Sequence, residues 1–339
     1  MKILLPYSLS LGRRFNDPVI AGGIEKFCHS INDTFDDVHI LEIEDDSNII
    51  DNADKIKQTA LKNNCDLIIC NWNKGSYVGS KMWSSPVPIL FVCHGNHAMP
   101  STLQRFFKLK ENGHSVFFVS EFQKKYYERF AKRMKTTLAD IDGFINSGYL
   151  QGEKPKIVEH EYDCCTIGRC DPNEKKPFLL KTLLKETGIK NLVITNSIKD
   201  GAPEYNYYLK NKHWDNTLWD LQYKDVMKNL SKSMTFFQTY WEETFGLTTL
   251  EALSHGIPVI LNAKDNIHAA ETIPEKKEHI KKIEKNNKTE LIDAINNFRN
   301  IDRKEIQDMT WEKHTYNKWK LHFMNCIDKA VENFKSKKI

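Results

Sequence analysis

Long apolar runs are missing from this chain of 339 residues. No run approaches the roughly 20 residues that a helix needs to cross a bilayer. The opening Met1-Lys-Ile-Leu-Leu-Pro6 is too short an apolar stretch for a signal peptide and ends at a proline. These absences exclude a membrane-spanning protein, and we expect a soluble protein of the cytoplasm.

The sequence also lacks cysteines spaced as the ligands of a zinc ion are, although the chain has 8 cysteines. The tightest group combines Cys164, Cys165 and Cys170 with His160, and none of these has the Cys-x2-Cys spacing of a structural zinc site. We expect the stretch 161–168 to form a buried strand. Four other cysteines lie within apolar stretches, as reduced core thiols do: Cys28, Cys65, Cys70 and Cys93.

The dinucleotide-binding fingerprint Gly-x-Gly-x-x-Gly is absent, which disfavours a nicotinamide-dependent oxidoreductase. In its place, Ala21-Gly22-Gly23-Ile24-Glu25 follows the first expected strand and a long loop. Paired glycines let the backbone approach a ligand at the start of a helix.

Low-complexity segments and internal repeats are absent, and 40% hydrophobic residues are ordinary for a globular protein. The length exceeds what one hydrophobic core supports, so two domains are expected. The first half alternates strands and helices, which predicts a parallel α/β domain over residues 1–157. Its expected strands are 2–6, 38–43, 66–70, 88–93 and 115–119, and its expected helices are 23–32 and 53–63.

A second α/β series predicts another domain over 158–310, with strands near 191–194, 234–238 and 257–261. The final segment, 311–339, contains an expected helix over 311–334. Its apolar residues recur at helical intervals: Trp319, Phe323, Ile327 and Ala330.

The most informative stretch is Glu243-Thr-Phe-Gly-Leu-Thr-Thr-Leu-Glu251, which leads to Pro258-Val-Ile260. It predicts a loop, a helix over 247–255 and a buried strand over 257–261. Such a helix directs its first free backbone N–H groups, near Gly246, Leu247 and Thr248, at an anion such as a diphosphate. The two carboxylates are pure acceptors suited to pairs of hydroxyl groups.

At these residues the sequence resembles the retaining GT-B glycosyltransferases of the glycogen-synthase-like superfamily. Their signature is Glu, seven residues and Glu, followed by a small-residue turn and Pro-Val-Ile. The resemblance implies two facing Rossmann-like domains and a C-terminal helix that crosses back onto the first. It also implies that Glu243 contacts the donor sugar and Glu251 the nucleotide ribose. We expect Phe245, Gly246, Leu247 and Thr248, at the start of the helix, to bind the donor as well.

Three further elements resemble parts of this family. The Gly22-Gly23 pair matches a Gly-Gly-x-Glu element that borders donor and acceptor. Arg169 matches a Gly-Arg segment followed by a lysine that binds the donor diphosphate; the spacing leaves Lys175 and Lys176 as alternatives. His94, at the end of an expected strand, matches a histidine that touches the transferred sugar.

The expected reaction moves a hexosyl or pentosyl group from a nucleoside-diphosphate sugar to a hydroxyl group. Fixed cations and helix N–H groups can stabilise the charge of the leaving diphosphate. The one Asp-x-Asp considered as a metal clamp, Asp140-Ile-Asp142, lies outside the expected donor domain, so we expect no metal and no cofactor. The family implies retention of configuration, and we expect Glu243 and Glu251 to bind hydroxyl groups rather than act as a hydrolase pair.

The distribution of basic residues suggests what kind of acceptor the protein binds. Residues 101–137 contain nine bases and three acids, whereas the whole chain has a net charge of only +4. Phe122, Tyr126, Phe130 and Met134 recur every four residues, which predicts one buried helical face. The basic side is a solvated surface, a dock for anionic lipid headgroups or a phosphate-backbone contact.

Arg13 and Arg14 add positive charge on the expected acceptor side. The resemblance to GT-B enzymes implies two acceptors that a basic surface would suit. One is a hydroxymethylated base in bacteriophage DNA, in the host cytoplasm, because the bacteriophage glycosyltransferases that modify such bases share this architecture. The other is a bacterial glycan or glycolipid at a membrane surface. A GT-B-like sugar-nucleotide epimerase and a non-catalytic nucleotide-sugar-binding protein are the rival hypotheses.

Overall fold

The computed structural model describes residues 1–8, 15, 23–43, 49–71, 82–95, 99–146, 148–173, 175–239, 243–262 and 277–337. The chain forms two compact units. The first contains Met1–Tyr149 and Tyr316–Ile339, and the second contains Leu150–Thr315. The C-terminal helix thus belongs to the first unit, although the second unit precedes it in the chain.

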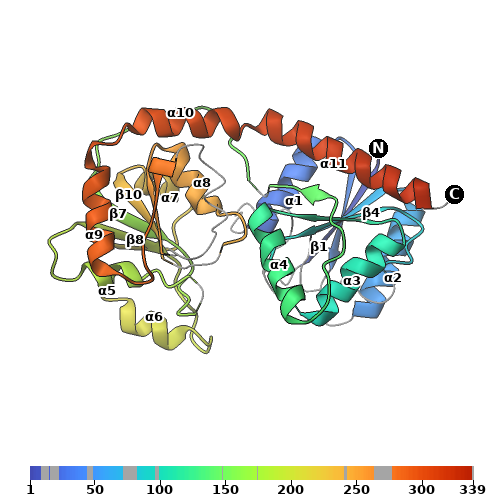
Figure 1. Ribbon diagram of the computed structural model, residues 1–339, viewed down its shortest axis with the longest axis horizontal. Helices are drawn as coiled ribbons and strands as arrows, with labels where there is room; N and C mark the ends of the chain where they lie inside the picture. Colours follow the sequence, from blue (N-terminus) through green and yellow to red (C-terminus); the bar gives the residue numbers. More distant parts are fainter. Residues whose placement is uncertain are drawn as a thin grey trace. The chain divides into compact units, whose positions relative to one another are not determined.

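The first unit contains, in its described part, a six-stranded parallel sheet in the order β2-β1-β3-β4-β5-β6. Its strands are β1 (Ile3–Ser8), β2 (Val38–Ile43), β3 (Leu67–Cys70), β4 (Ile89–Cys93), β5 (Ser115–Phe118) and β6 (Gly143–Phe144). Its helices are α1 (Gly23–Thr34), α2 (Ile49–Lys62), α3 (Pro100–Glu111), α4 (Glu121–Arg133) and α11 (Tyr316–Lys337). Every residue of β3, β4 and β5 is buried, as expected of apolar strands covered on both faces. Figure 1 shows α11 beside β4 of this unit.

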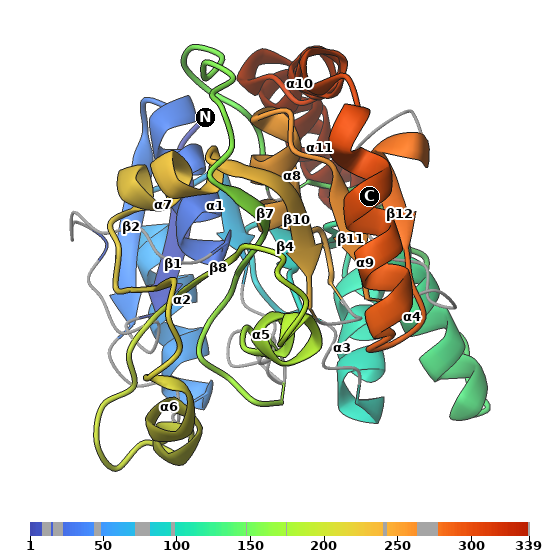
Figure 2. The ribbon, with the colours of Figure 1, turned by 90° about the vertical axis from the view of Figure 1, so that its left-hand side faces the viewer.

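The second unit contains, among the residues described, another six-stranded parallel sheet, in the order β12-β11-β10-β7-β8-β9. Its strands are β7 (Tyr162–Ile167), β8 (Asn191–Thr195), β9 (Thr217–Trp219), β10 (Ser233–Gln238), β11 (Val259–Leu261) and β12 (Ile280–Lys282). Its helices are α5 (Leu179–Leu184), α6 (Tyr205–Asn211), α7 (Tyr223–Leu230), α8 (Leu247–Ser254), α9 (Lys288–Asn297) and α10 (Arg303–Lys313). Two 3-10 turns, Lys277–His279 and Phe298–Asn300, complete it. Figure 2 shows these strands with α9 beside β11.

The expected buried strand at 161–168 is confirmed as β7. Cys164 and Cys165 are fully buried within it, and Cys170 is buried just after it. The described cysteines are all free thiols. Burial raises the pKa of Cys165 to about 12 and that of Cys170 to about 11, so both thiols stay protonated and act as core residues.

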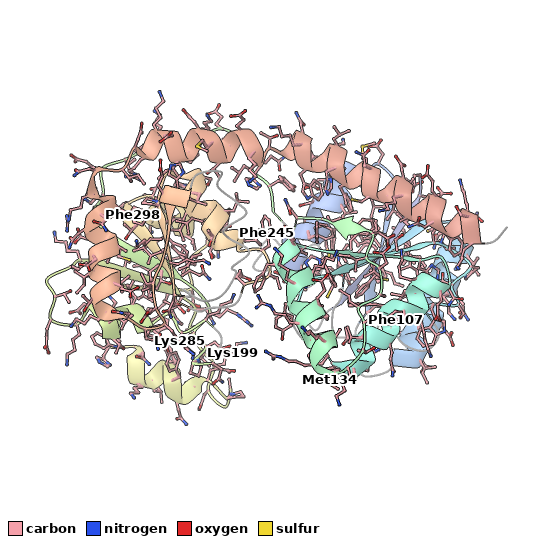
Figure 3. All side chains as sticks on the ribbon, in the orientation of Figure 1. Phe107, Met134, Lys199, Phe245, Lys285 and Phe298 are labelled. Carbon is pink, nitrogen blue, oxygen red and sulfur yellow. The ribbon has the colours of Figure 1, made fainter. Side chains whose placement is uncertain are left out.

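The expected apolar face of α4 is partly wrong. Phe122 is buried, and Tyr126 and Phe130 are partly buried against the core. Met134 is 47% exposed and lies just past the end of α4, as Figure 3 shows. The buried residues of α4 also include Gln123, Tyr127 and Ala131, whereas Met134 is the C-cap residue, beyond the last residue of the helix.

The expected single helix over 311–334 is two helices. Trp311 belongs to α10, which ends at Lys313, and α11 begins at Tyr316. Thr315 forms a parallel β-bridge with Leu150, and such a bridge needs extended backbone, which interrupts the helix. Within α11, the expected apolar residues Trp319, Phe323, Ile327 and Ala330 are buried.

A search of the described helices for a membrane span finds none with enough length and apolar character to cross a bilayer.

Candidate functional site

The polar residues predicted to bind a donor gather at the carboxyl edge of the second sheet. All pairings in this sheet are parallel, so the carboxyl ends of its strands meet at one edge. Arg169 and Lys175 follow β7, and Glu243 and Gly246 follow β10. In α/β sheets this edge is where ligands bind.

Gly246 is the N-cap of α8 and has a left-handed backbone, with φ of 90° and ψ of 61°. Only glycine adopts this conformation without strain. A Cβ atom there would also lie 3.4 Å from the Glu243 Cγ atom and 3.4 Å from the Thr249 Cβ atom. These are ordinary contact distances, so the left-handed backbone is what requires glycine at the start of α8.

Lys175 and Glu243 form an ion pair across this edge. The Lys175 Nζ atom lies 3.1 Å from the Glu243 Oε2 atom, and the two side chains are 25% and 18% exposed. The backbone N–H of Thr244 donates to the other carboxylate oxygen, Oε1, at 3.1 Å. The Glu243 carboxylate is thus held from two sides at the start of α8.

The Lys175 backbone is also fixed. The Thr239 hydroxyl donates to the Lys175 carbonyl oxygen, and a Cβ atom on Gly168 would lie 3.1 Å from the Lys175 Cβ atom. Lys176 has a left-handed φ of 45° and donates its backbone N–H to the Asp171 carbonyl at 2.8 Å. Of the two alternative lysines, Lys175 is the one with an ion pair to Glu243. Arg169 lies in the same loop with an exposed side chain.

The first turns of α8 hold the remaining predicted donor residues. Phe245 is 2% exposed and lies just before the helix (Figure 3). Leu247 and Thr248 open the helix and are partly exposed. Glu251, in the second turn, accepts a hydrogen bond from the Tyr223 hydroxyl at 3.0 Å.

Sequence reasoning missed three residues that organise this edge: Gln238, Thr239 and Tyr223. The Gln238 side-chain oxygen accepts hydrogen bonds from the Thr248 and Thr249 hydroxyls, both at 3.4 Å. Gln238 is the buried last residue of β10. The signal in the sequence that could have revealed it is a glutamine at the end of an expected strand.

In the first unit, His94 directly follows β4. Its Nε2 atom is buried and forms no hydrogen bond with the described residues. Burial lowers the pKa of His94 to about 3, and the Phe27 ring contacts the imidazole edge-on with centroids 5.1 Å apart. His94 is therefore a neutral imidazole at neutral pH.

The turn after His94 is held by two buried side chains of α4. The Gly95 carbonyl accepts hydrogen bonds from the Gln123 amide at 2.9 Å and from the Tyr127 hydroxyl at 3.1 Å. Gly23 is the first residue of α1. Arg13, Arg14 and Gly22 lie outside the described residues.

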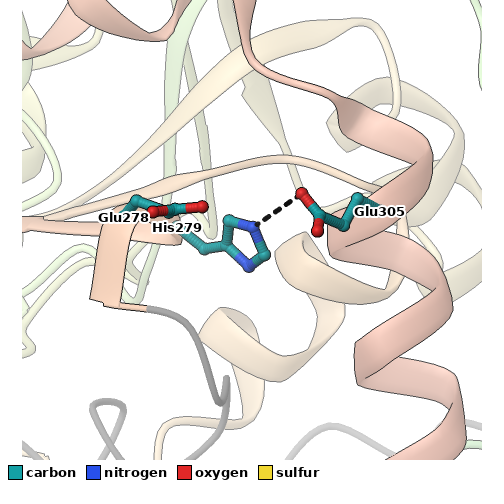
Figure 4. Close-up of side chains that lie close together, drawn as sticks. All are labelled: Glu278, His279 and Glu305. Atoms are coloured by element: carbon teal, nitrogen blue, oxygen red, sulfur yellow. Dashed lines mark ion pairs between the residues drawn. The ribbon is translucent and has the colours of Figure 1, made fainter.

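One group of described side chains could hold a metal ion: Glu278, His279 and Glu305. The His279 Nε2 atom lies 3.8 Å from the Glu305 Oε2 atom (Figure 4). Glu278 and His279 directly precede β12, and Glu305 lies in the first turn of α10. This places the group at the amino edge of the sheet, whereas Lys175 and Glu243 lie at the carboxyl edge.

The sequence matches no model of a known protein family, and no curated protein matches it. Solved structures match it over nearly the whole chain. A glycosyltransferase from Rickettsia africae has a TM-score of 0.68 at 15% identity, covering 98% of this chain and 99% of its own. Anabaena HepE, solved with UDP-glucose, has a TM-score of 0.69 at 14% identity, covering 97% and 99%.

Sucrose-phosphate synthase from Thermosynechococcus elongatus has a TM-score of 0.70 at 12% identity, covering 97% of this chain and 98% of its own. The chain has the GT-B fold. At 12 to 15% identity, this likeness establishes the fold alone. The expected α/β class and GT-B fold are thus confirmed, and each unit contains a six-stranded parallel sheet among its described residues.

Proposed function

We propose that this protein is a glycosyltransferase that moves a sugar from a nucleoside-diphosphate sugar to a hydroxyl acceptor. The observation that carries the proposal is the Lys175 and Glu243 pair, 3.1 Å apart, at the start of α8, with Glu251 in the second turn of that helix. A cation and backbone N–H groups suit a diphosphate, and the two carboxylates suit sugar and ribose hydroxyls. HepE, which shares the fold, has been solved with UDP-glucose.

The chemistry requires stabilisation of the negative charge that develops on the leaving diphosphate. Lys175, Arg169 and the N–H groups of α8 supply positive potential at this edge of the sheet, which favours departure of the diphosphate. The proposed reaction therefore needs no metal and no other cofactor. The resemblance in the 243–260 motif supports retention of configuration, with the leaving phosphate accepting the proton of the acceptor hydroxyl.

His94 has a different place in this proposal. A neutral imidazole cannot supply a fixed positive charge, but it can donate or accept a hydrogen bond to a sugar hydroxyl. We assign it to contact with the transferred sugar.

The donor-site assignment predicts different effects for its two glutamates. Glu243→Ala should lower turnover by about 100-fold and change nucleotide affinity little, because its contact matters at the reacting sugar. Glu251→Ala should weaken nucleoside-diphosphate binding by about tenfold, the loss of one charged hydrogen bond. Incubation with labelled nucleotide sugars and calorimetry with nucleoside diphosphates measure the two effects.

Glu159→Ala is the matched control, because Glu159 is an exposed residue that precedes β7 at the amino edge of the same sheet. Equal activity of the Glu243 and Glu251 variants and the control would contradict both roles. Isomerised nucleotide sugar, or binding without turnover, would instead identify an epimerase or a binding protein.

The acceptor is proposed to be anionic. Lys124 and Lys125 form ion pairs with Glu128 and Glu121 along α4. The cations near the end of this helix have exposed side chains: Arg129, Lys132, Arg133 and Lys135. Two acceptors match this charge, a hydroxymethylated base in bacteriophage DNA and a glycolipid or glycan at an anionic membrane surface.

Binding to duplex DNA and to anionic vesicles across a salt series separates the two acceptors. Retention of DNA on filters at low salt, lost steeply as salt rises, would support the DNA acceptor. Flotation with anionic but not neutral vesicles would support the lipid acceptor. If the protein binds neither DNA nor anionic vesicles, the basic surface near the end of α4 contacts only solvent.

A further inference from the structure

Tyr223 is the first residue of α7, directly after the loop that follows β9. It therefore reaches the carboxyl edge of the second sheet from a different crossover than Glu251, which lies on α8 after β10. Its hydroxyl lies 3.0 Å from the Glu251 Oε1 atom, although its side chain is 48% exposed.

The protonation state of Tyr223 decides which group donates this hydrogen bond. Desolvation and the neighbouring Glu251 carboxylate raise the pKa of Tyr223, so the phenol keeps its proton and donates it to the carboxylate. A hydrogen bond from a neutral donor to an ionised acceptor is stronger than one between neutral groups.

The backbone of Glu251 is held separately from its side chain. The Ser254 hydroxyl donates to the Glu251 carbonyl oxygen at 2.7 Å, and the His255 Nδ1 atom lies 2.8 Å from the same oxygen. These contacts fix the second turn of α8 but not the rotamer of the carboxylate. The Tyr223 hydroxyl bonds that carboxylate directly.

We propose that Tyr223 is a positioning residue for the nucleoside of the donor. By occupying Oε1 of Glu251, the phenol turns Oε2 toward the ribose hydroxyls, so the pair discriminates ribonucleotides from 2′-deoxyribonucleotides. This inference rests on the proposed function, since it assigns Glu251 to the ribose.

A double-mutant cycle tests the role on the full chain. Calorimetry measures the affinities of UDP, GDP and ADP and of their 2′-deoxy counterparts for the wild type, Tyr223→Phe, Glu251→Ala and the double variant. Tyr223→Phe keeps the ring and removes only the hydroxyl. It should weaken binding of the preferred ribonucleotide by about three- to tenfold and leave the 2′-deoxy form within about twofold.

In the Glu251→Ala background, Tyr223→Phe should have no further effect, because its target is gone. Tyr162→Phe, at the start of β7 on the opposite edge of the sheet, is the matched control and should bind like the wild type. Unchanged ribonucleotide affinity in Tyr223→Phe, or an equal loss with and without Glu251, would overturn the positioning role alone. A wild-type chain that binds none of the nucleotides would overturn the proposed function as well.

Discussion

The surroundings of the His94 imidazole favour its neutral form. Its Nε2 atom is shielded from water and bonds no described residue, and the edge of the Phe27 ring lies against it. An imidazolium in this position would lose its hydration without gaining a described partner. The cost of charging it is the physical cause of its lowered pKa.

This cost predicts a pH dependence of stability. The pKa of His94 is about 3 in the folded chain and 6.5 as the ordinary value, so below pH 6.5 the unfolded chain binds the proton first. Stability should fall as the pH drops from 6.5 toward 3, by at most about 1.4 kcal/mol per pH unit. Urea unfolding between pH 5 and 7.5 measures the slope.

His94→Asn is the comparison variant for this experiment, because asparagine is polar but does not titrate. The free energy of unfolding of this variant should change less with pH between pH 5 and 7.5 than that of the wild type. The same slope in both chains would show that other groups carry the acid sensitivity.

The α8 helix is the element on which the donor-site assignment depends, and both of its ends are constrained. Its start requires the left-handed Gly246. After its end, Gly256 has a φ of 70°, and a Cβ atom there would lie 2.3 Å from the Arg303 carbonyl oxygen. The close approach of α10 therefore requires glycine at this position as well.

The Arg303 guanidinium links several backbone segments near the end of α8. It donates to the carbonyl oxygens of Val158 at 2.9 Å, Gly256 at 3.2 Å, and Ser231 and His255 at 3.4 Å each. One side chain thus satisfies backbone groups from the end of α7, the end of α8 and the segment before β7.

Arg303→Met should lower the free energy of unfolding by about 2 to 3 kcal/mol, because it leaves these carbonyl groups without their donor. Arg299→Met is the control: Arg299 is 48% exposed and pairs with Asp163 at 3.3 Å, so its loss should cost less than about 1 kcal/mol. Chemical denaturation of both variants measures the difference. Equal stability of the two variants would show that the Arg303 hydrogen bonds do not stabilise the fold.

At the scale of the whole molecule, the end of the chain completes the core of the first unit. Phe323 of α11 is fully buried. Its ring contacts those of Trp319, Phe27 and Phe35, with centroids 5.1, 5.6 and 6.1 Å apart. The residues assigned to the donor, apart from Gly22, Gly23 and His94, lie in the other unit, Leu150–Thr315.

Phe323→Ala should therefore destabilise the first unit by about 3 to 5 kcal/mol while leaving the affinity for a nucleoside diphosphate unchanged. Hydrogen exchange resolved along the chain, together with calorimetry of nucleotide binding at low temperature, measures both. Leu321→Ala, at a side chain that is 65% exposed, should change neither. Loss of nucleotide affinity in Phe323→Ala below its melting temperature would contradict this separation.

The sequence could predict elements with a strong local signal, such as a run of β-branched and leucine residues or a helix that begins at the glycine of the 243–251 motif. The strand over 38–43 was predicted with the bounds of β2, and the helix over 247–255 differs from α8 by one residue. The sequence analysis gave no bounds for the helices α3 and α9, of 12 and 10 residues, nor for several short elements. The β9 strand has three residues, all partly exposed, and the helices α5, α6 and α7 are 6 to 8 residues long, so none gives a long periodic signal.

The sequence by itself determined the α/β character of both units and the glycine at the start of α8, because apolar runs and backbone sterics act over a few neighbouring residues. Only the tertiary structure decided that Lys175 rather than Lys176 pairs with Glu243, 68 positions away. It alone brought Tyr223 to Glu251, 28 positions further along. Such contacts arise because parallel strands deliver separate loops to one edge of a sheet, and no local pattern encodes which side chains meet there.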